Sequence, residues 1–375
     1  MMKNEQSINV WQTSIMLFLM IFANKVLLLP SLLYREANVE GTICYIILFL
    51  LEIGLITLFI YLKRKYPETS FHELIKAKLG TITLKVIYIL FIIFFVCKLV
   101  LIYNITYIFF KDLIYKQDNS VIFLICFLPI INYLSFINFR AFGRTCQLFF
   151  PIILIIALFC VLLSFISVDS VPLLYQSNLS GIIITTLKHI SSFGDVIFLF
   201  IFMDKIDYKK GDGKKLFSLV ILAIILVVGV SVAFYYSYTY TSFMHPYAIF
   251  EILGNIKDYG GLGRIDVIAV IFVMFLTYFQ MAIYLKSYTK CFNVVFTKLN
   301  SIYALVSFDI GFILIVELLI RNLEKTIAYG ESVLPYLSLI SFFIVPICSI
   351  IFLIIKKKQN NKEKEWCKPK TLNVI

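Results

Sequence analysis

Two short polar stretches interrupt apolar segments of this chain, and they hold its clearest candidates for chemistry. One is Ala-Asn-Lys at residues 23–25, and the other is Ser-Ser-Phe-Gly-Asp at residues 191–195. A charged side chain at the centre of a membrane helix costs about 2.5–3.5 kcal/mol, so each needs a partner or a function. A helix that breaks inside the membrane also frees backbone N–H and C=O groups, which bind polar ligands. We therefore predict a small-molecule site at these stretches.

Asp195 is the sharpest candidate. A carboxylate beside a break can hold an ammonium group or a proton, and the alternative is a structural ion pair with a buried lysine such as Lys25 or Lys98. The ammonium group of Lys25 can replace a bound sodium ion, bind a substrate carboxylate or lose its proton through burial. It can also pair with Asp195 and only hold the bundle together. The residue types leave these alternatives open.

Other polar residues lie inside apolar segments. Glu52 and Lys98 are predicted to pair with each other, and Asp309 and Glu317 are spaced so that they lie on one helical face. Tyr103 is a weaker candidate to face the site, and Thr277 is a weaker candidate to bind a cation. The candidate ligand-binding residues are Ala23, Asn24, Lys25, Tyr103, Ser191, Ser192, Phe193, Gly194, Asp195 and Thr277.

The composition determines the class of protein. Of the 375 residues, 61% are hydrophobic, which is above the range of about 45–50% in soluble domains. We therefore expect an all-α integral membrane protein. The chain has no phosphate-binding loop, no Gly-x-Ser-x-Gly and no His-Glu-x-x-His motif, and its eight cysteines show no metal-binding spacing. We expect no enzyme activity, no metal and no cofactor.

Ten segments are apolar and about 20 residues long, which is the length that crosses a bilayer. The predicted spans are residues 9–34, 41–62, 84–110, 120–138, 146–167, 184–203, 216–240, 264–286, 300–320 and 333–355. They form one permease-like domain over residues 1–355, and residues 356–375 form a basic tail that we expect to be disordered. Residues 247–256 are predicted to form a short amphipathic helix in the longest outer connection.

Lysine and arginine predict the orientation. The connections on one side hold 23 of these residues and those on the other side hold 7. Because the cytoplasmic side carries the excess, both termini are predicted to be cytoplasmic. The net charge of +12 is therefore explained by topology and by contact with anionic lipid, and no nucleic-acid partner is expected.

Ten spans divide into two sets of five that run in opposite directions, which is the topology of an inverted repeat. Spans 1 and 6 are then equivalent, and each carries one polar interruption near its centre. Sites in such repeats lie near the midplane, where the two halves meet.

The chain resembles the B subunit of spore germinant receptors. The resemblance rests on the ten-span plan, the leading Ser-Ile-Asn-Val-Trp-Gln at residues 7–12, Leu-Leu-Pro at 28–30, Phe-Gly-Asp at 193–195 and Gly-Arg-Ile-Asp at 263–266. It covers approximately residues 7–355. Two features depart from related permeases: no glycine precedes Pro30 in the first break, and Phe-Gly-Asp replaces the common Phe-x-Gly-Phe-Glu.

The resemblance implies a LeuT-like fold of the amino acid–polyamine–organocation superfamily. It implies a subunit that binds a small nutrient, often an amino acid, and signals a dormant spore to germinate. It also implies a larger membrane partner (A subunit), a lipoprotein partner (C subunit) and a place in the cell membrane or the spore inner membrane. The alternative function is a secondary transporter of amino acids or amines, with or without coupling to protons.

Overall fold

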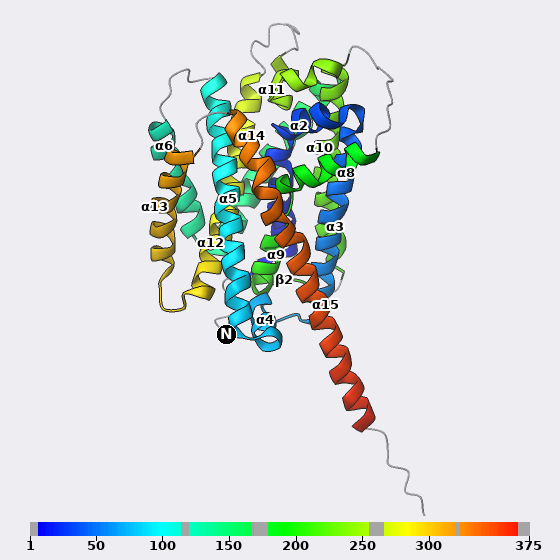
Figure 1. Cartoon of the computed structure of the whole chain (residues 1–375), viewed down its shortest axis with the longest axis vertical. Coiled ribbons are helices and arrows are strands. Elements are labelled where there is room, and N and C mark those ends of the chain that lie inside the picture. The colour runs from blue at the N-terminus through cyan, green and yellow to red at the C-terminus, as the bar shows by residue number, and fades with distance from the viewer. Residues whose placement is uncertain are drawn as a thin grey trace, which may run out of the picture.

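The computed structural model describes residues 7–113, 120–166, 168, 179–209, 211–254, 266–319 and 323–366. Long helices run side by side along the molecule, and several of the shorter ones gather at one end (Figure 1). The helices are α1 (Val10–Phe22), α2 (Leu29–Ala37), α3 (Gly41–Lys65), α4 (Phe71–Leu79), α5 (Thr81–Leu113), α6 (Ser120–Phe136), α7 (Phe139–Ile166), α8 (Leu179–Lys188), α9 (Ile197–Ile201), α10 (Gly213–Tyr238), α11 (Ala248–Gly254), α12 (Asp266–Val295), α13 (Ser301–Leu319), α14 (Leu323–Ser332) and α15 (Leu334–Trp366).

The described helices are typical of a membrane protein. Six stretches are long and apolar enough to cross a bilayer: Leu29–Lys65, Thr81–Asp112, Phe139–Ile166, Gly213–Tyr238, Val267–Val295 and Glu324–Phe352. Three shorter apolar helices accompany them, at Val10–Phe22, Phe123–Phe136 and Ser301–Val316. Large apolar side chains such as Leu148 and Ile155 are 72% and 66% exposed, which suits contact with lipid tails. The chain is an all-α, multi-pass membrane protein, as its composition predicts.

Helix α1 lies inside the bundle. Every residue from Gln12 to Phe22 is buried, and α7, α10 and α12 pack around it. From Ile15 to Phe22 the helix is apolar on all sides, and such a helix belongs in a core rather than at a surface. Its start is fixed by Asn9, whose side chain accepts from the N–H of Gln12 at 2.8 Å while the Gln12 side chain accepts from the N–H of Asn9 at 3.3 Å.

The residues before α1 and after α9 are joined by a short parallel pair of strands. Strand β1 (Ile8–Asn9) pairs with β2 (Ile206–Asp207), with Ile8 opposite Ile206. The start of the first broken segment and the end of the second are therefore held together at one end of the bundle.

Several elements differ from the sequence prediction. Helix α15 continues to Trp366, whereas the tail from Lys356 was expected to be disordered; its lysines, its glutamates and Gln359 are good helix formers. Helices α4 and α14 were not predicted, although Ser70 and Glu73 form a capping box that marks the start of α4. The predicted helix over 247–256 is confirmed as α11, and residues 255–256 and 263–265 lie outside the described part.

Candidate ligand-binding site

The first predicted break is present. Helix α1 ends at Phe22, a 3-10 turn spans Asn24–Val26, and α2 begins at Leu29. Pro30 lies in the first turn of α2, where its missing N–H costs no helical hydrogen bond. This proline can start a helix but cannot continue one from α1 without loss, so the chain breaks just before it.

The second predicted break is also present. Helix α8 ends at Lys188, a 3-10 turn follows over His189–Ser192, and Phe193 is extended. Gly194 has φ +89°, a conformation that glycine adopts without steric cost, and α9 begins only at Ile197. This glycine conformation takes the chain out of the helical path, and the next residue, Asp195, contacts the first break.

The two breaks meet through Lys25 and Asp195. The Nζ atom of Lys25 donates to Oδ2 of Asp195 at 2.6 Å and to the two carboxylate oxygens of Glu52 on α3 at 3.2 and 3.3 Å. The side chains of all three residues are at most 1% exposed. Of the alternatives left open by the sequence, the ion pair between Lys25 and Asp195 is the one present in this conformation. Glu52 belongs to the same cluster.

Lys98 on α5 holds the second break from the other side. Its Nζ donates to the backbone oxygen of Phe193 at 2.9 Å and to Oδ1 of Asp195 at 3.3 Å. The predicted pairing of Lys98 with Glu52 is wrong in this conformation: Lys98 pairs with Asp195, and Glu52 accepts from Lys25 and from the N–H of Gly194 at 3.1 Å. The reason is that Gly194 directs its N–H at Glu52 and the Phe193 carbonyl at Lys98.

Three uncharged residues lie in or beside the cluster, and the sequence prediction missed all of them. The hydroxyl of Tyr284 on α12 donates to Oδ1 of Asp195, and that of Tyr45 on α3 donates to the backbone oxygen of Lys25 at 2.7 Å. Gln280, one turn from Tyr284, donates to the oxygen of Met20 at 3.4 Å. Gln280 and Tyr284 lie four positions apart in an apolar helix, so the sequence could have indicated that they share one face. A single tyrosine such as Tyr45 gives no such indication in a tyrosine-rich chain.

The cluster is electrically balanced. Two ammonium groups, Lys25 and Lys98, face two carboxylates, Glu52 and Asp195, all within the bundle. The ring of Phe193 lies 4.5 Å from Nζ of Lys25 and adds a cation–π contact. Because removing one partner from a buried ion pair leaves an uncompensated charge, each of these four groups depends on the others.

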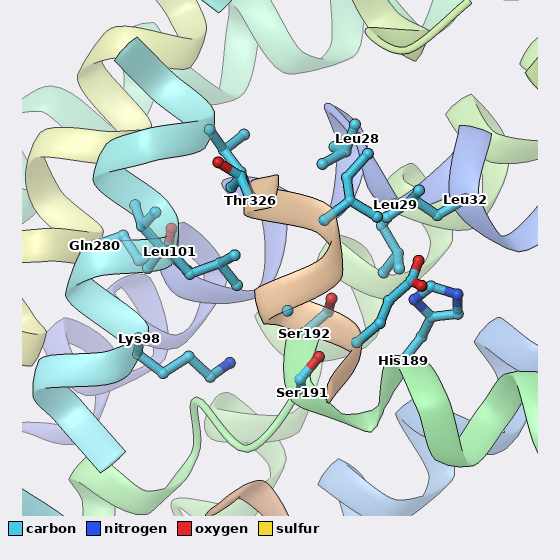
Figure 2. Close-up of a pocket in the computed structure, with 15 residues that line it drawn as sticks. Leu28, Leu29, Leu32, Lys98, Leu101, His189, Ser191, Ser192, Gln280 and Thr326 are labelled. Carbon is cyan, nitrogen blue, oxygen red and sulfur yellow. The ribbon is translucent and has the colours of Figure 1, made fainter. Parts of the chain in front are cut away.

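A cavity of about 40 Å³ adjoins the second break. Figure 2 shows Lys98, Ser191 and Ser192 on one part of its wall and Leu28, Leu29 and Leu32 on another. This volume holds about three water molecules, so a larger ligand requires the cavity to open. Within the described part of the chain, Oε1 of Gln280, which also lines the cavity, has no hydrogen-bond partner.

Ion pairs join three elements at one edge of this cavity. Lys188 pairs with Glu36 and, at 2.8 Å, with Glu331; Arg35 pairs with Glu331 at 2.9 Å. The donor atoms of Glu36, His189 and Glu331 lie within 4.8 Å of one another and are types that bind a divalent cation. Lys188 and Arg35 already pair with the carboxylates of Glu36 and Glu331. We therefore interpret these residues as a set of ion pairs that holds α2, α8 and α14 together, and not as a metal site.

The remaining predicted residues are dispersed. Tyr103 packs against the rings of Tyr107, Phe123, Phe127 and Phe312, and the hydroxyl of Thr277 donates to the carbonyl of Val273 in its own helix. Ala23 caps α1, and Ser191 is buried within the 3-10 turn. Asn24 lies in the first break, but its side chain, like that of Glu317, is outside the described part. The structure therefore brings together Lys25, Phe193, Gly194 and Asp195.

A family model described as "Spore germination protein" matches residues 7–325. No curated protein matches the chain. The matched region contains both breaks and every residue of the central ion-pair cluster.

Proposed function

The chain belongs to the spore germination protein family, and from this premise we propose that it is the permease-like subunit of a germinant receptor. In this proposal it binds a small nutrient, an amino acid, where the two breaks meet. Binding changes the conformation of the subunit and triggers germination. The protein acts as a receptor and carries out no reaction on its ligand.

The contact between Lys25 and Asp195 is the observation that carries the proposal. It joins two unwound segments inside an apolar bundle, where backbone groups and opposite charges are concentrated. An amino acid carries an ammonium and a carboxylate group of its own. Its ammonium group competes with Lys25 for Asp195, and its carboxylate is attracted to the lysines released by that exchange.

The proposed architecture is a LeuT-like fold of ten spans in a five-plus-five inverted repeat. Six long helical stretches, three shorter apolar helices and the broken pair of α8 and α9 support ten crossings. A break in the first segment and a break in the sixth, in contact with each other, support the equivalence of spans 1 and 6.

The size of the cavity supports a mechanism that includes opening. About 40 Å³ is too little for an amino acid, and α14 lies over the cavity through Thr326, Ile327 and Gly330. We propose that a nutrient enters when the ion pairs between α2, α8 and α14 separate. Closure around the ligand then moves α14 and α15, which transmit the change to partner subunits.

We propose the A subunit and the lipoprotein C subunit as those partners, in the cell membrane or spore inner membrane, with both termini in the cytoplasm. A screen tests the binding step. Purified protein is heated with single amino acids, sugars and nucleosides, and the unfolding temperature is measured. At least one amino acid is expected to raise it saturably; no effect from any amino acid would contradict the proposal.

The second candidate function is transport of amino acids or amines, which the two broken segments favour because transporters bind substrates at such breaks. Proteoliposomes that contain this chain alone separate the two functions. A receptor binds the labelled nutrient and leaves the lumen empty. Accumulation in the lumen, abolished by Asp195→Asn, would instead establish a transporter.

A further inference from the structure

A carboxyl group outside the central cluster lies between α6 and α13, which run side by side at one edge of the bundle (Figure 1). Asp309 is the ninth residue of α13, about 12 Å along the helix from its first residue. Nδ2 of Asn132 on α6 donates to Oδ2 of Asp309 at 2.8 Å. Apolar side chains nearby in the two helices, Ile130, Val306 and Ile310, are between 44% and 58% exposed. This part of the surface therefore faces lipid tails rather than water.

Each of these two bonded side chains has one oxygen atom that lacks a partner. In the described part of the chain, Oδ1 of Asp309 and Oδ1 of Asn132 make no hydrogen bond, although both atoms are enclosed by the fold. When the carboxyl group is ionised, both atoms are acceptors, so neither can satisfy the other. A buried polar atom without a partner loses its hydrogen bonds to water and gains none in return. The pair therefore requires one more donor.

The surroundings of Asp309 provide no compensating charge among the described residues. Helices α5, α6 and α12 pack against α13. The ammonium group of Lys286 on α12 lies at the end of α6, where it donates to the backbone oxygen of Ser135 at 2.7 Å. Tyr288 on α12 and Tyr103 on α5 contact residues of α13, and tyrosine hydroxyls are uncharged near neutral pH. An ionised Asp309 would therefore be a charge without a partner.

A proton on Asp309 satisfies both oxygen atoms, because a neutral carboxyl group has one O–H donor. With the hydrogen on its Oδ1, Asp309 donates to Oδ1 of Asn132 while Nδ2 of Asn132 donates to Oδ2 of Asp309. The acid and the amide then form a ring that is closed by two hydrogen bonds. The proton also removes a charge that is costly inside a bilayer. It needs no cavity, whereas a metal ion needs several oxygen ligands around it.

We propose that Asp309 and Asn132 form a proton-binding site that joins α6 to α13. The proton comes from water and forms an O–H bond with the carboxylate of Asp309; its release leaves the electron pair of that bond on the carboxylate. The protonated site holds the two helices together. The ionised site leaves two acceptors without a donor, so it weakens the contact between the helices. The site shares no residue with the central ion-pair cluster, and it stands or falls separately from the proposed function.

Infrared spectroscopy of the full chain in lipid bilayers measures the protonation state directly. At neutral pH, the wild type is expected to show the carbonyl stretch of a neutral carboxylic acid, and Asp309→Asn is expected to lose this band. The control is Asp212→Asn, which removes a carboxylate paired with Lys215 at 3.0 Å and should keep the acid band. A loss of carboxylate bands in Asp309→Asn, with the acid band unchanged, would overturn the proposal.

A second variant tests the pairing of the two side chains. Asn132→Leu removes the acceptor for the acid hydrogen, so the acid band is expected to remain and to move to higher frequency. An unchanged band position would overturn the pairing. This measurement does not depend on the folding of Asp309→Asn, because the band of Asp309 is followed in a chain that keeps the carboxyl group.

The unfolding temperature tests the consequence for the bundle. Asparagine offers a donor and an acceptor like the neutral acid, so Asp309→Asn is expected to unfold near the wild-type temperature at neutral pH. As the pH rises and Asp309 releases its proton, the wild type is expected to lose stability relative to Asp309→Asn. A difference that does not change with pH would contradict the site. Stabilisation of the wild type alone by sodium or calcium ions, with Asp309 ionised at neutral pH, would identify a metal site instead and overturn the proposal.

Discussion

Nζ of Lys25 lies 2.6 Å from Oδ2 of Asp195, although the two residues are 170 positions apart in the chain. Each belongs to a segment that stops being helical inside the apolar bundle. The contact therefore shows that the two helix breaks lie next to each other in the folded protein. Lys98 and Glu52 extend it into a balanced cluster of four charges, and Tyr284 bonds to the central carboxylate.

Removing either partner of this pair should destabilise the protein, and removing both should restore it. Lys25→Met and Asp195→Asn each leave an opposite charge buried without compensation, at a cost of about 3–5 kcal/mol. The double variant keeps Glu52 and Lys98 as a balanced pair. Thermal unfolding in detergent should show two destabilised single variants and a double variant near wild type. Additive losses in the double variant would exclude the pairing.

Loss of the Tyr284 hydroxyl should weaken the site without unfolding it. Tyr284→Phe removes one hydrogen bond to a charged acceptor, worth about 1.5–3 kcal/mol. Tyr288→Phe, one turn away on α12, removes a 3.4 Å contact with Ser307 and serves as the control. Nutrient affinity, measured by calorimetry, should fall at least about tenfold only in Tyr284→Phe. Equal effects of the two variants would assign Tyr284 a general packing role.

Gly194→Ala should reduce both stability and binding. Gly194 and Gly211 have φ +89° and φ +105°, so alanine at either position is strained by about 1–3 kcal/mol. Gly211 lies in a turn before α10 with open space around it, which makes Gly211→Ala a matched control. Both variants should lose similar stability, but only Gly194→Ala should change nutrient affinity. A parallel loss of affinity in Gly211→Ala would show that strain alone is responsible.

Nutrient binding should not depend on sodium. The ammonium group of Lys98 bonds to the Phe193 carbonyl and to Asp195, a set of oxygen atoms that also suits a monovalent cation. Replacing sodium with potassium in the buffer should leave the affinity of the wild-type protein unchanged. Lys98→Ala removes the ammonium group from these oxygen atoms, so this variant should bind the nutrient more weakly than wild type. Its affinity should then increase when sodium is added, because a sodium ion can occupy the position of the lost ammonium group. A wild-type affinity that falls without sodium would contradict this role for Lys98.

Local chemistry made both breaks predictable. Pro30 and Gly194 act on the backbone within their own turns, so their effect on the helix could be inferred without knowledge of its neighbours. The high fraction of hydrophobic residues likewise predicts a multi-pass membrane protein, and the six long apolar helices among the described residues agree with this prediction.

Partner choice was not predictable in the same way. Glu52 was predicted to pair with Lys98, but its partner is Lys25, because the second break presents the N–H of Gly194 to Glu52 and the carbonyl of Phe193 to Lys98. The contact of Tyr284 with Asp195 depends on how α12 packs beside α5 and the second break. The rotation and depth of a helix within a bundle are set by packing, which no local pattern encodes.

The most direct measurement compares nutrient affinity in two carboxylate variants of the purified subunit. Asp195→Asn removes the charge at the meeting point of the breaks. Asp309→Asn removes another carboxyl group within the bundle, which bonds to Asn132 at 2.8 Å. With the nutrient identified by the unfolding screen, calorimetry should show affinity reduced at least about tenfold by Asp195→Asn and unchanged by Asp309→Asn. Full affinity in a folded Asp195→Asn variant would place the nutrient elsewhere and contradict the account.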